Sequence, residues 1–202
     1  MKLNRKSMWS LQFSTVALVL IPAAIGINFL GKLFAELLKL PLWIDSIGTV
    51  LSAMLAGPII GAIVGIINNV IYGFTTSPIS FVYAITQAVI GLVVGIMAYK
   101  GWISSVKKAI ILGLVVGFIA ATVSTPLNIM FWEGMTGNVW GDALFAYLRA
   151  NDNALWVASF ADSIVVDVPD KVVTVLLSFL LFRSLPKNVK NMYDNHGEIE
   201  KL

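Results

Sequence analysis

Three aspartates and a lysine lie close together in a segment that is otherwise apolar enough for a lipid bilayer. The segment, DSIVVDVPDKVVTVLLSFLLF, runs from Asp162 to Phe182 and also contains Asp167, Asp170 and Lys171. At 1.5 Å per residue, Lys171 lies about 17 Å from the end of a helix that stops at Phe182, which is near mid-membrane. A charge at that depth costs about 2.5 to 3.5 kcal/mol on insertion scales. The segment therefore predicts either a structural ion pair or a polar site.

Two interpretations of these charges stay open. Asp167 and Lys171 are four residues apart, so they lie on one face of a helix and can neutralise each other while Pro169 bends it. This pairing leaves Asp162 and Asp170 without partners, and ionisable residues inside a membrane generally face a bundle interior or a wet cavity. The second interpretation places Asp167, Asp170 and Lys171 in a pocket, where they pair with a carboxylate or an amine of a substrate.

The composition identifies an integral membrane protein. The 202 residues are 58% hydrophobic and 12% charged, with a mean hydropathy of +0.86. Too few polar residues are therefore present to cover the surface of a water-soluble domain. The chain is too short to hold a soluble catalytic or ATP-binding domain beside its helices. It has no Cys, which excludes disulfides and thiolate chemistry. The single His196 lies in the polar tail, where we expect it to be solvated.

The apolar runs predict an all-α integral membrane protein with six transmembrane helices and cytoplasmic N- and C-termini. A single membrane domain covers residues 1–190, and a polar cytoplasmic tail covers 191–202. The second and third helices are short for full crossings and meet at Gly57-Pro58; we interpret them as two short helices rather than a re-entrant hairpin. The approximate helix bounds are 11–38, 43–56, 59–74, 79–99, 109–130 and 163–182.

The connection over residues 131–157 is the longest one and is expected to be an extracellular loop. Its tryptophans and tyrosine indicate a packed loop, although they are also typical of an aromatic belt at the membrane surface. The sequence leaves open whether this loop is a lid. The first apolar run is too long for a cleavable signal peptide and lacks a small-residue cleavage site, so we expect it to be retained.

The basic residues favour this topology, because cytoplasmic loops carry an excess of Lys and Arg. Only four of the 14 basic residues fall in the outer half, where most of the acids also lie. A count of five or seven helices would place one terminal basic cluster on the wrong side. The inner segments hold Lys2, Arg5, Lys6, Lys100, Lys107, Lys108, Arg183, Lys187, Lys190 and Lys201.

Polar side chains on several expected helices fall at the same outer depth as the aspartates. The inner halves of these helices offer almost only Leu, Ile, Val, Gly and Ala, so the pattern predicts a polar cup above an apolar floor rather than a channel, which needs a continuous polar path. Asn68 or Gln87, taken singly, is also typical of a hydrogen bond between helices. The predicted substrate-binding residues are Asp45, Asn68, Asn69, Tyr72, Tyr83, Gln87, Asn128, Trp132, Asp167, Asp170 and Lys171.

Motifs for catalysis and for ATP use are absent from the sequence. It contains no GxxxxGK[ST], no HExxH and no GxSxG, and no cluster with metal-ligand spacing. We therefore predict no catalytic residue, no metal and no cofactor. Inverted repeats, common in secondary transporters, are not found either, so uptake against a gradient would need a separate motor.

Two stretches, together with the overall helix plan, resemble the substrate-binding S components of energy-coupling factor (ECF) transporters. The stretches are LWIDSIGTVLSAMLAGPIIGAIVGIINNVIYG at 42–73 and PDKVVTVLLSFLLFRSLPK at 169–187. The resemblance implies a multi-pass subunit of an ABC-type importer in the bacterial plasma membrane, without an ATPase site of its own. It would bind a vitamin or a related micronutrient on the outer side.

The resemblance also implies partners. They are a vitamin-like small-molecule substrate, a transmembrane coupling subunit, two ATPase subunits and the lipid bilayer. The resemblance implies no nucleic-acid partner. In that family, ATP-driven motion topples the S component so that its pocket reaches the cytoplasm. Many members carry AxxxA on the first helix for docking, whereas this chain has Ala17, Ala23, Ala24 and Gly26 there without that spacing. The docking face therefore stays open, and the first three helices are expected to supply it.

Two other functions remain as alternatives. A solo proton- or cation-coupled transporter would use Asp162, Asp167 and Asp170 as a relay. A membrane enzyme acting on lipid would need carboxylate or histidine clusters near the headgroups, which the lone tail histidine does not supply. The sequence does not identify which vitamin or micronutrient is bound.

Overall fold

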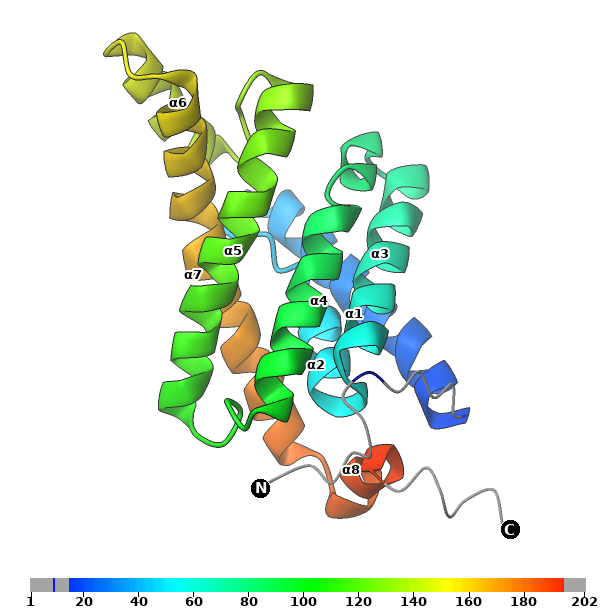
Figure 1. The fold of residues 1–202 in the computed structure, drawn as a ribbon. Helices are drawn as coiled ribbons and strands as arrows, with labels where there is room; N and C mark the ends of the chain where they lie inside the picture. Colours follow the sequence, from blue (N-terminus) through cyan, green and yellow to red (C-terminus); the bar gives the residue numbers. More distant parts are fainter. Residues whose placement is uncertain (1–8, 10–14, 195–202) are drawn as a thin grey trace.

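Helices account for all the regular secondary structure in the part of the chain that the computed structural model describes, Trp9 and residues 15–194 (Figure 1). The helix over 11–38 is described only from Thr15, and His196 and the rest of the tail after Asp194 lie outside the described residues. The elements are α1 (Thr15–Leu37), α2 (Ile47–Ala56), α3 (Pro58–Thr75), the 3₁₀ helix η1 (Pro78–Phe81), α4 (Ala84–Tyr99), α5 (Val106–Trp132), α6 (Val139–Ala150), α7 (Leu155–Ser184) and α8 (Lys187–Asp194).

The long helices form a bundle whose two ends differ. In Figure 1, α6 lies at one end and α8 at the other. We call these the α6 end and the α8 end. The most extensive helix contacts join α5 to α7 and α3 to α4, and α2 packs against α1, α3, α4 and α7. The short helix α2 is therefore surrounded by the rest of the bundle.

Glycines allow the two main helix pairs to pack closely. A Cβ atom on Gly117 of α5 would lie 2.7 Å from the Cα atom of Val168 on α7, and one on Gly113 would lie 2.7 Å from that of Val172. On α4, a Cβ atom on Gly91 would collide with the backbone of Gly61 on α3. Small residues four apart bring helix backbones together in this way in membrane proteins.

The interior toward the α8 end is apolar. Buried side chains of α2, α4, α5 and α7 form one hydrophobic cluster there, and α8 adds Tyr193. The largest contributors include Met54, Leu112 and Phe179, which are fully buried. This cluster is the apolar floor that the sequence predicted.

The connection over 131–157 is not a loop along its whole length, so that expectation is wrong. It contains α6, whose first turn is capped by the Asn138 side chain accepting from the backbone N–H of Trp140 at 3.1 Å. Helix α5 ends where Glu133 adopts a left-handed conformation, and α7 begins at Leu155, well before residue 163. The tryptophans of this region lie on helices rather than on a loop.

The second helix begins at Ile47 rather than near residue 43. The residues before it, 39–46, form an irregular segment in which Lys39 and Ile44 have positive φ angles of 49° and 51°. The fourth helix is likewise interrupted, because η1 precedes α4. Both irregular segments lie at the α6 end of the bundle, where they border the cavity described below.

Three described helices are long and apolar enough to span a membrane by length and composition, and two apolar helices are shorter. The three are residues 18–37, 58–75 and 106–132; the shorter ones are α2 and α4. Helix α7 has 30 residues but carries buried charges in its first half and at its middle. The count of six crossings stays a prediction.

Candidate functional site

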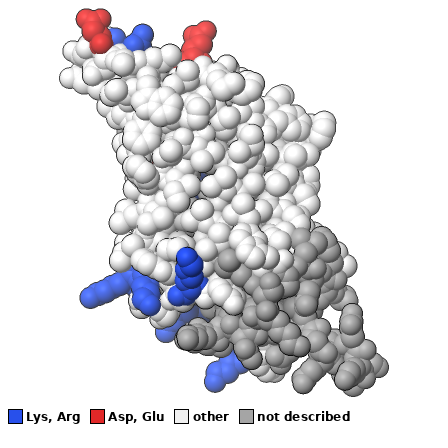
Figure 2. Space-filling model, in the orientation of Figure 1, with Lys and Arg blue, Asp and Glu red and all other residues white. Residues whose placement is uncertain are grey.

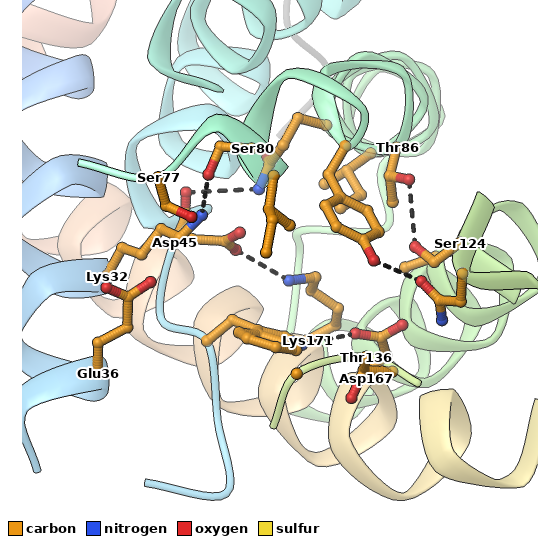
Figure 3. A pocket seen from close by; sticks show the side chains of 18 of the residues that line it. Lys32, Glu36, Asp45, Ser77, Ser80, Thr86, Ser124, Thr136, Asp167 and Lys171 are labelled. Carbon is orange, nitrogen blue, oxygen red and sulfur yellow. Dashed lines mark hydrogen bonds and ion pairs between the residues drawn. The ribbon is translucent and has the colours of Figure 1, made fainter. Parts of the chain in front are cut away.

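A cavity of about 340 Å³ lies between the helices toward the α6 end (Figure 3). Its wall comes from α1, the 39–46 segment, the residues around η1, α4, α5, the start of the α6 region and α7. The lining residues are Lys32, Glu36, Trp43, Asp45, Thr76, Ser77, Ile79, Ser80, Tyr83, Thr86, Gln87, Ile90, Ala120, Ser124, Asn128, Thr136, Gly137, Asp167 and Lys171.

The cavity brings together a little over half of the residues predicted to bind a substrate. They come from four different parts of the chain, which only the fold places side by side. These residues are Asp45, Tyr83, Gln87, Asn128, Asp167 and Lys171. The predicted polar cup above an apolar floor is therefore present, with the cavity at one end of the bundle and the hydrophobic cluster toward the other.

The other five predicted residues do not line the cavity. Asn68 and Asn69 are fully buried on α3 and hydrogen-bond to each other at 3.2 Å. Tyr72 and Asp170 are fully buried outside the lining, and Trp132 is the last residue of α5. Depth along a helix was predicted from the sequence, but the direction in which these side chains point was not.

Several lining residues were missed as site residues. Lys32 and Glu36 stand four apart on α1, and this spacing of charges in an apolar helix was a usable signal. Thr86 and Ser124 carried a weaker signal, since hydroxyl side chains are common in helices of membrane proteins. Trp43, Thr136 and the residues around η1 lie in irregular segments, where no periodicity shows which way a side chain points.

Lys171 forms its ion pairs with Asp45 and Asp170. Its Nζ atom lies 2.5 Å from Oδ2 of Asp170 and 3.2 Å from Oδ1 of Asp45 (Figure 3 shows the second contact). In the described part of the chain no ion pair joins it to Asp167, so the first of the two interpretations, an ion pair between residues four apart, is not what the structure contains. The physical reason is that Asp45, brought in from the 39–46 segment, lies within reach of the lysine.

Asp170 fixes the 39–46 segment to α7. Its Oδ1 atom accepts the backbone N–H groups of Trp43 at 3.0 Å and of Ile44 at 2.8 Å, and the side chain is fully buried. Asp167, one turn earlier, accepts the indole N–H of Trp43 at 3.1 Å. A carboxylate that accepts two backbone N–H groups and an ammonium is well compensated despite its burial.

The α1 side of the cavity is held by a second polar group. Lys32 Nζ donates to Oγ of Ser80 at 2.7 Å and lies 4.3 Å from the centre of the Tyr72 ring. Tyr72 in turn donates its hydroxyl to Oε2 of Glu36 at 2.6 Å. Tyr72 therefore orients both charged residues of α1 from behind the wall.

The α4 and α5 side presents amides and hydroxyls. Tyr83 donates to Oδ1 of Asn128 at 2.5 Å, and the Asn128 amide donates to Ser163 at 3.0 Å. Thr86 and Ser124 are hydrogen-bonded at 3.1 Å (Figure 3). These contacts fix the orientation of the polar groups before any ligand arrives.

The cavity is covered at the α6 end by the residues before α6. Thr136 donates its backbone N–H and its hydroxyl to Asp162, at 3.1 Å and 2.8 Å. Asn138 donates to the backbone oxygen of Leu40 at 3.1 Å, and the Trp140 indole donates to that of Lys39 at 3.1 Å. The start of α6 is thus bound to both α7 and the 39–46 segment.

The chemistry of the cavity is that of a binding site. No group of three or more His, Cys, Asp or Glu side chains that could hold a metal ion occurs within Trp9 and residues 15–194. The lining combines fixed hydrogen-bonding groups with two aromatic side chains and with Ile79, Ile90 and Ala120. Such a mixture of apolar wall and a few oriented polar groups is typical of small-molecule sites.

Comparison with family models gives a match that covers most of the chain. Residues 16–186 match the family described as "ECF transporter, substrate-specific component". Comparisons with curated proteins and with solved structures gave no match.

Proposed function

Because this chain belongs to the family of ECF transporter substrate-specific components, we propose that it captures a vitamin or related micronutrient from outside the cell and delivers it inward with an ATP-driven coupling module. Membership in this family makes the chain a substrate-binding membrane subunit rather than an enzyme. The resemblance found in the sequence is thereby confirmed. The cavity at the α6 end is the proposed binding site.

The observation that carries the proposal is the cavity with fixed polar groups above an apolar floor. A site of this kind holds a solute and offers no polar path for it beyond the floor. Transfer across the membrane therefore needs movement of the subunit itself, which a partner must drive. The described helices include no nucleotide-binding domain, and the proposed partners are a transmembrane coupling subunit and two ATPases.

The distribution of charges supports an orientation with the cavity facing outward. Figure 2 shows most of the lysines and arginines at the α8 end, acids together with a smaller basic group at the α6 end, and a wide band with almost no charge between them. Cytoplasmic segments carry the excess of Lys and Arg. The proposed topology therefore has α1, α2, α3, α4, α5 and α7 crossing the bacterial plasma membrane, with α6 at the outer surface.

Each proposed binding residue has a role that follows from its position. Asp45, Asp167 and Lys171 supply the charged part of the site, and Tyr83, Gln87 and Asn128 supply hydrogen bonds; all six line the cavity. Asp170 and Tyr72 act as positioning residues from behind it. Asn68, Asn69 and Trp132 do not line the cavity, and we propose no contact with substrate for them.

Reconstitution of the protein into liposomes distinguishes the proposed function from that of a cation-coupled transporter that works without partner subunits. The protein alone in liposomes is expected to bind a compound from a mixture of labelled vitamins without accumulating it. Accumulation should require the coupling subunit, the ATPases and ATP. Accumulation by the protein alone under a proton or sodium gradient would contradict the proposal and support a cation-coupled transporter.

A further inference from the structure

The charges around the cavity do not balance, and this imbalance bears on what it holds. Resting on the proposed function, we infer that the substrate is a small organic cation, with its positive charge beside Asp167 and an N–H group directed at Gln87. The chemical class is a protonated amine or a cationic nitrogen heterocycle. The inference rests on the charge count, on the partners of each charged group and on an unpaired buried acceptor.

Carboxylates outnumber ammonium groups at the site. Asp45, Asp167 and Glu36 line the cavity and Asp170 bonds to a lining residue, whereas Lys32 and Lys171 are the basic residues that the described part of the chain contributes to the lining. Four carboxylates against two ammonium groups leave a formal excess of two negative charges. An uncompensated charge away from water is costly, so a ligand that brings positive charge is favoured.

Lys171, the more buried of the two lysines, already forms two ion pairs. Lys171 is 2% exposed, and its ammonium lies between the carboxylates of Asp45 and Asp170. A substrate carboxylate at this lysine would have to displace one of these partners and would then face the freed acid. Lys171 therefore acts as a bridge between two acids, and this triad keeps one negative charge.

The second lysine, Lys32, lies near an acid of its own helix but forms no ion pair in the described part of the chain. Glu36 lies one turn from Lys32 on α1, and Tyr72 contacts both, through its ring to the lysine and through its hydroxyl to the glutamate. The Lys32 ammonium also donates to Ser80 at 2.7 Å. Lys32 and Glu36 together carry no formal net charge, so the formal excess lies in the group formed by Asp45, Asp167, Asp170 and Lys171.

Asp167 is the aspartate of the lining that forms no ion pair in the described part of the chain. It is 7% exposed, its Oδ1 atom accepts the Trp43 indole N–H at 3.1 Å, and among the residues that the structure describes no lysine or arginine forms an ion pair with it. It lines the cavity, so a ligand can reach it. The ring systems of Trp43 and Tyr83 also line the cavity, and aromatic faces attract cations.

Gln87 gives an independent indication of a donor on the ligand. Its side chain is 2% exposed and lines the cavity, and its Oε1 atom has no hydrogen-bond partner within the described part of the chain. Its Nε2 atom lies 3.5 Å from the backbone oxygen of Asp45, a long contact, and the oxygen is the end of the amide without a partner. A buried acceptor without a donor is unfavourable, and an N–H group of a bound cation would satisfy it.

The test is a binding panel built from matched compounds. Purified wild-type protein in detergent is incubated with sets that share a ring and differ in charge, such as tryptamine, tryptophol and indole-3-acetate, together with the corresponding sets of aliphatic and pyridine compounds. Thermal stabilisation and bound ligand by mass spectrometry are measured for each. Stabilisation confined to the cationic members is expected.

The variant Asp167→Asn identifies the carboxylate concerned. It keeps the size of the side chain and an oxygen for Trp43, and it is expected to weaken cation binding about 10- to 100-fold, the range for a lost charge-assisted contact. The matched control is Asp152→Asn, which makes the same change at an exposed residue outside the cavity. The control should bind as the wild type does.

The outcomes separate this inference from the proposed function. Binding of neutral or carboxylate members by the wild type, with the cations inactive, would overturn the cation assignment and leave solute capture intact. Cation binding that Asp167→Asn leaves unchanged would also overturn the assignment to Asp167. If the protein captures no small molecule from the panel or from a complete vitamin mixture, the proposed function fails together with the inference.

Discussion

Asp170 shows how a buried charge can serve the architecture of a site without touching its cavity. It is fully buried and joins Lys171 to the backbone of Trp43 and Ile44, which lie more than 120 residues away in sequence. The acid therefore connects the charged part of the cavity to the irregular segment that forms its wall. Its neighbour in the sequence, Lys171, is held by this acid through an ion pair.

We expect Asp170→Asn to destabilise the protein. The amide can still accept from the backbone, but it leaves the Lys171 ammonium with one carboxylate fewer, and breaking a buried ion pair costs about 3 to 5 kcal/mol. The measurement is the thermal unfolding midpoint in detergent, with Asp152→Asn as the exposed control. An unchanged midpoint would show that Asp170 has no structural role.

At the scale of elements, the α5–α7 contact depends on the absence of side chains at two positions of α5. Gly113 and Gly117 lie against the backbone of α7 next to Val172 and Val168. The part of α7 that they contact is the part that carries the charged residues of the site. The separation of these two helices therefore sets the position of Asp167 and Lys171 relative to α5.

Gly117→Ala tests this close packing. The new Cβ atom would lie 2.7 Å from Val168 Cα, so the backbones must move apart, and we expect a loss of about 1 to 3 kcal/mol of stability, as for other overpacked sites. Gly26→Ala on α1 is the control, because nothing lies within 4 Å of the added atom. Equal unfolding midpoints for the two variants would contradict the packing described here.

The start of α6 and the 39–46 segment form a second unit, which covers the cavity. Asn138 links them, since it caps α6 and also donates to the backbone of Leu40. We expect Asn138→Ala to release a bound ligand several-fold faster, because losing this hydrogen bond and the cap costs on the order of 1 kcal/mol each. Ligand dissociation is measured by stopped-flow displacement.

The control for this prediction is Asn151→Ala at the other end of α6. Asn151 bonds to the backbone of its own helix at Tyr147 and is exposed. Its replacement should leave the dissociation rate as in the wild type. If Asn138→Ala also leaves that rate unchanged, the cover does not control ligand exit.

At the scale of the whole molecule, the two ends of the bundle have different chemistry. The α6 end holds the polar cavity, and the α8 end holds the apolar cluster and the exposed lysines and arginines (Figure 2). A protein with this asymmetry has a defined orientation in a membrane, because basic segments stay on the cytoplasmic side. The side from which the solute enters follows from that orientation.

Single cysteines test the orientation directly, because the chain has none of its own. Asp152→Cys places a thiol at the α6 end and Lys107→Cys places one at the α8 end, and both positions are exposed. In intact cells a membrane-impermeant maleimide should label the first and not the second. Labelling of position 107 alone would invert the topology and the proposed direction of capture.

The sequence by itself determined the class of the protein, the approximate places of its helices and the depth of its polar residues. Lipid allows few polar groups, so each aspartate or asparagine in an apolar run is noticeable, and its depth follows from simple counting along a helix. That is why Asp45, Gln87 and Asp167 were predicted together. The same reasoning supported the family resemblance, which the family match then confirmed.

Only the tertiary structure decided which polar groups meet. The rotation of a helix about its own axis depends on contacts with other helices, so Asn68 and Asn69 have the predicted depth and yet do not line the cavity. The partner of Lys171 comes from an irregular segment far away in sequence, where no local pattern exists to predict it. Hydrophobicity fixes how deep a residue lies, whereas packing fixes what it faces.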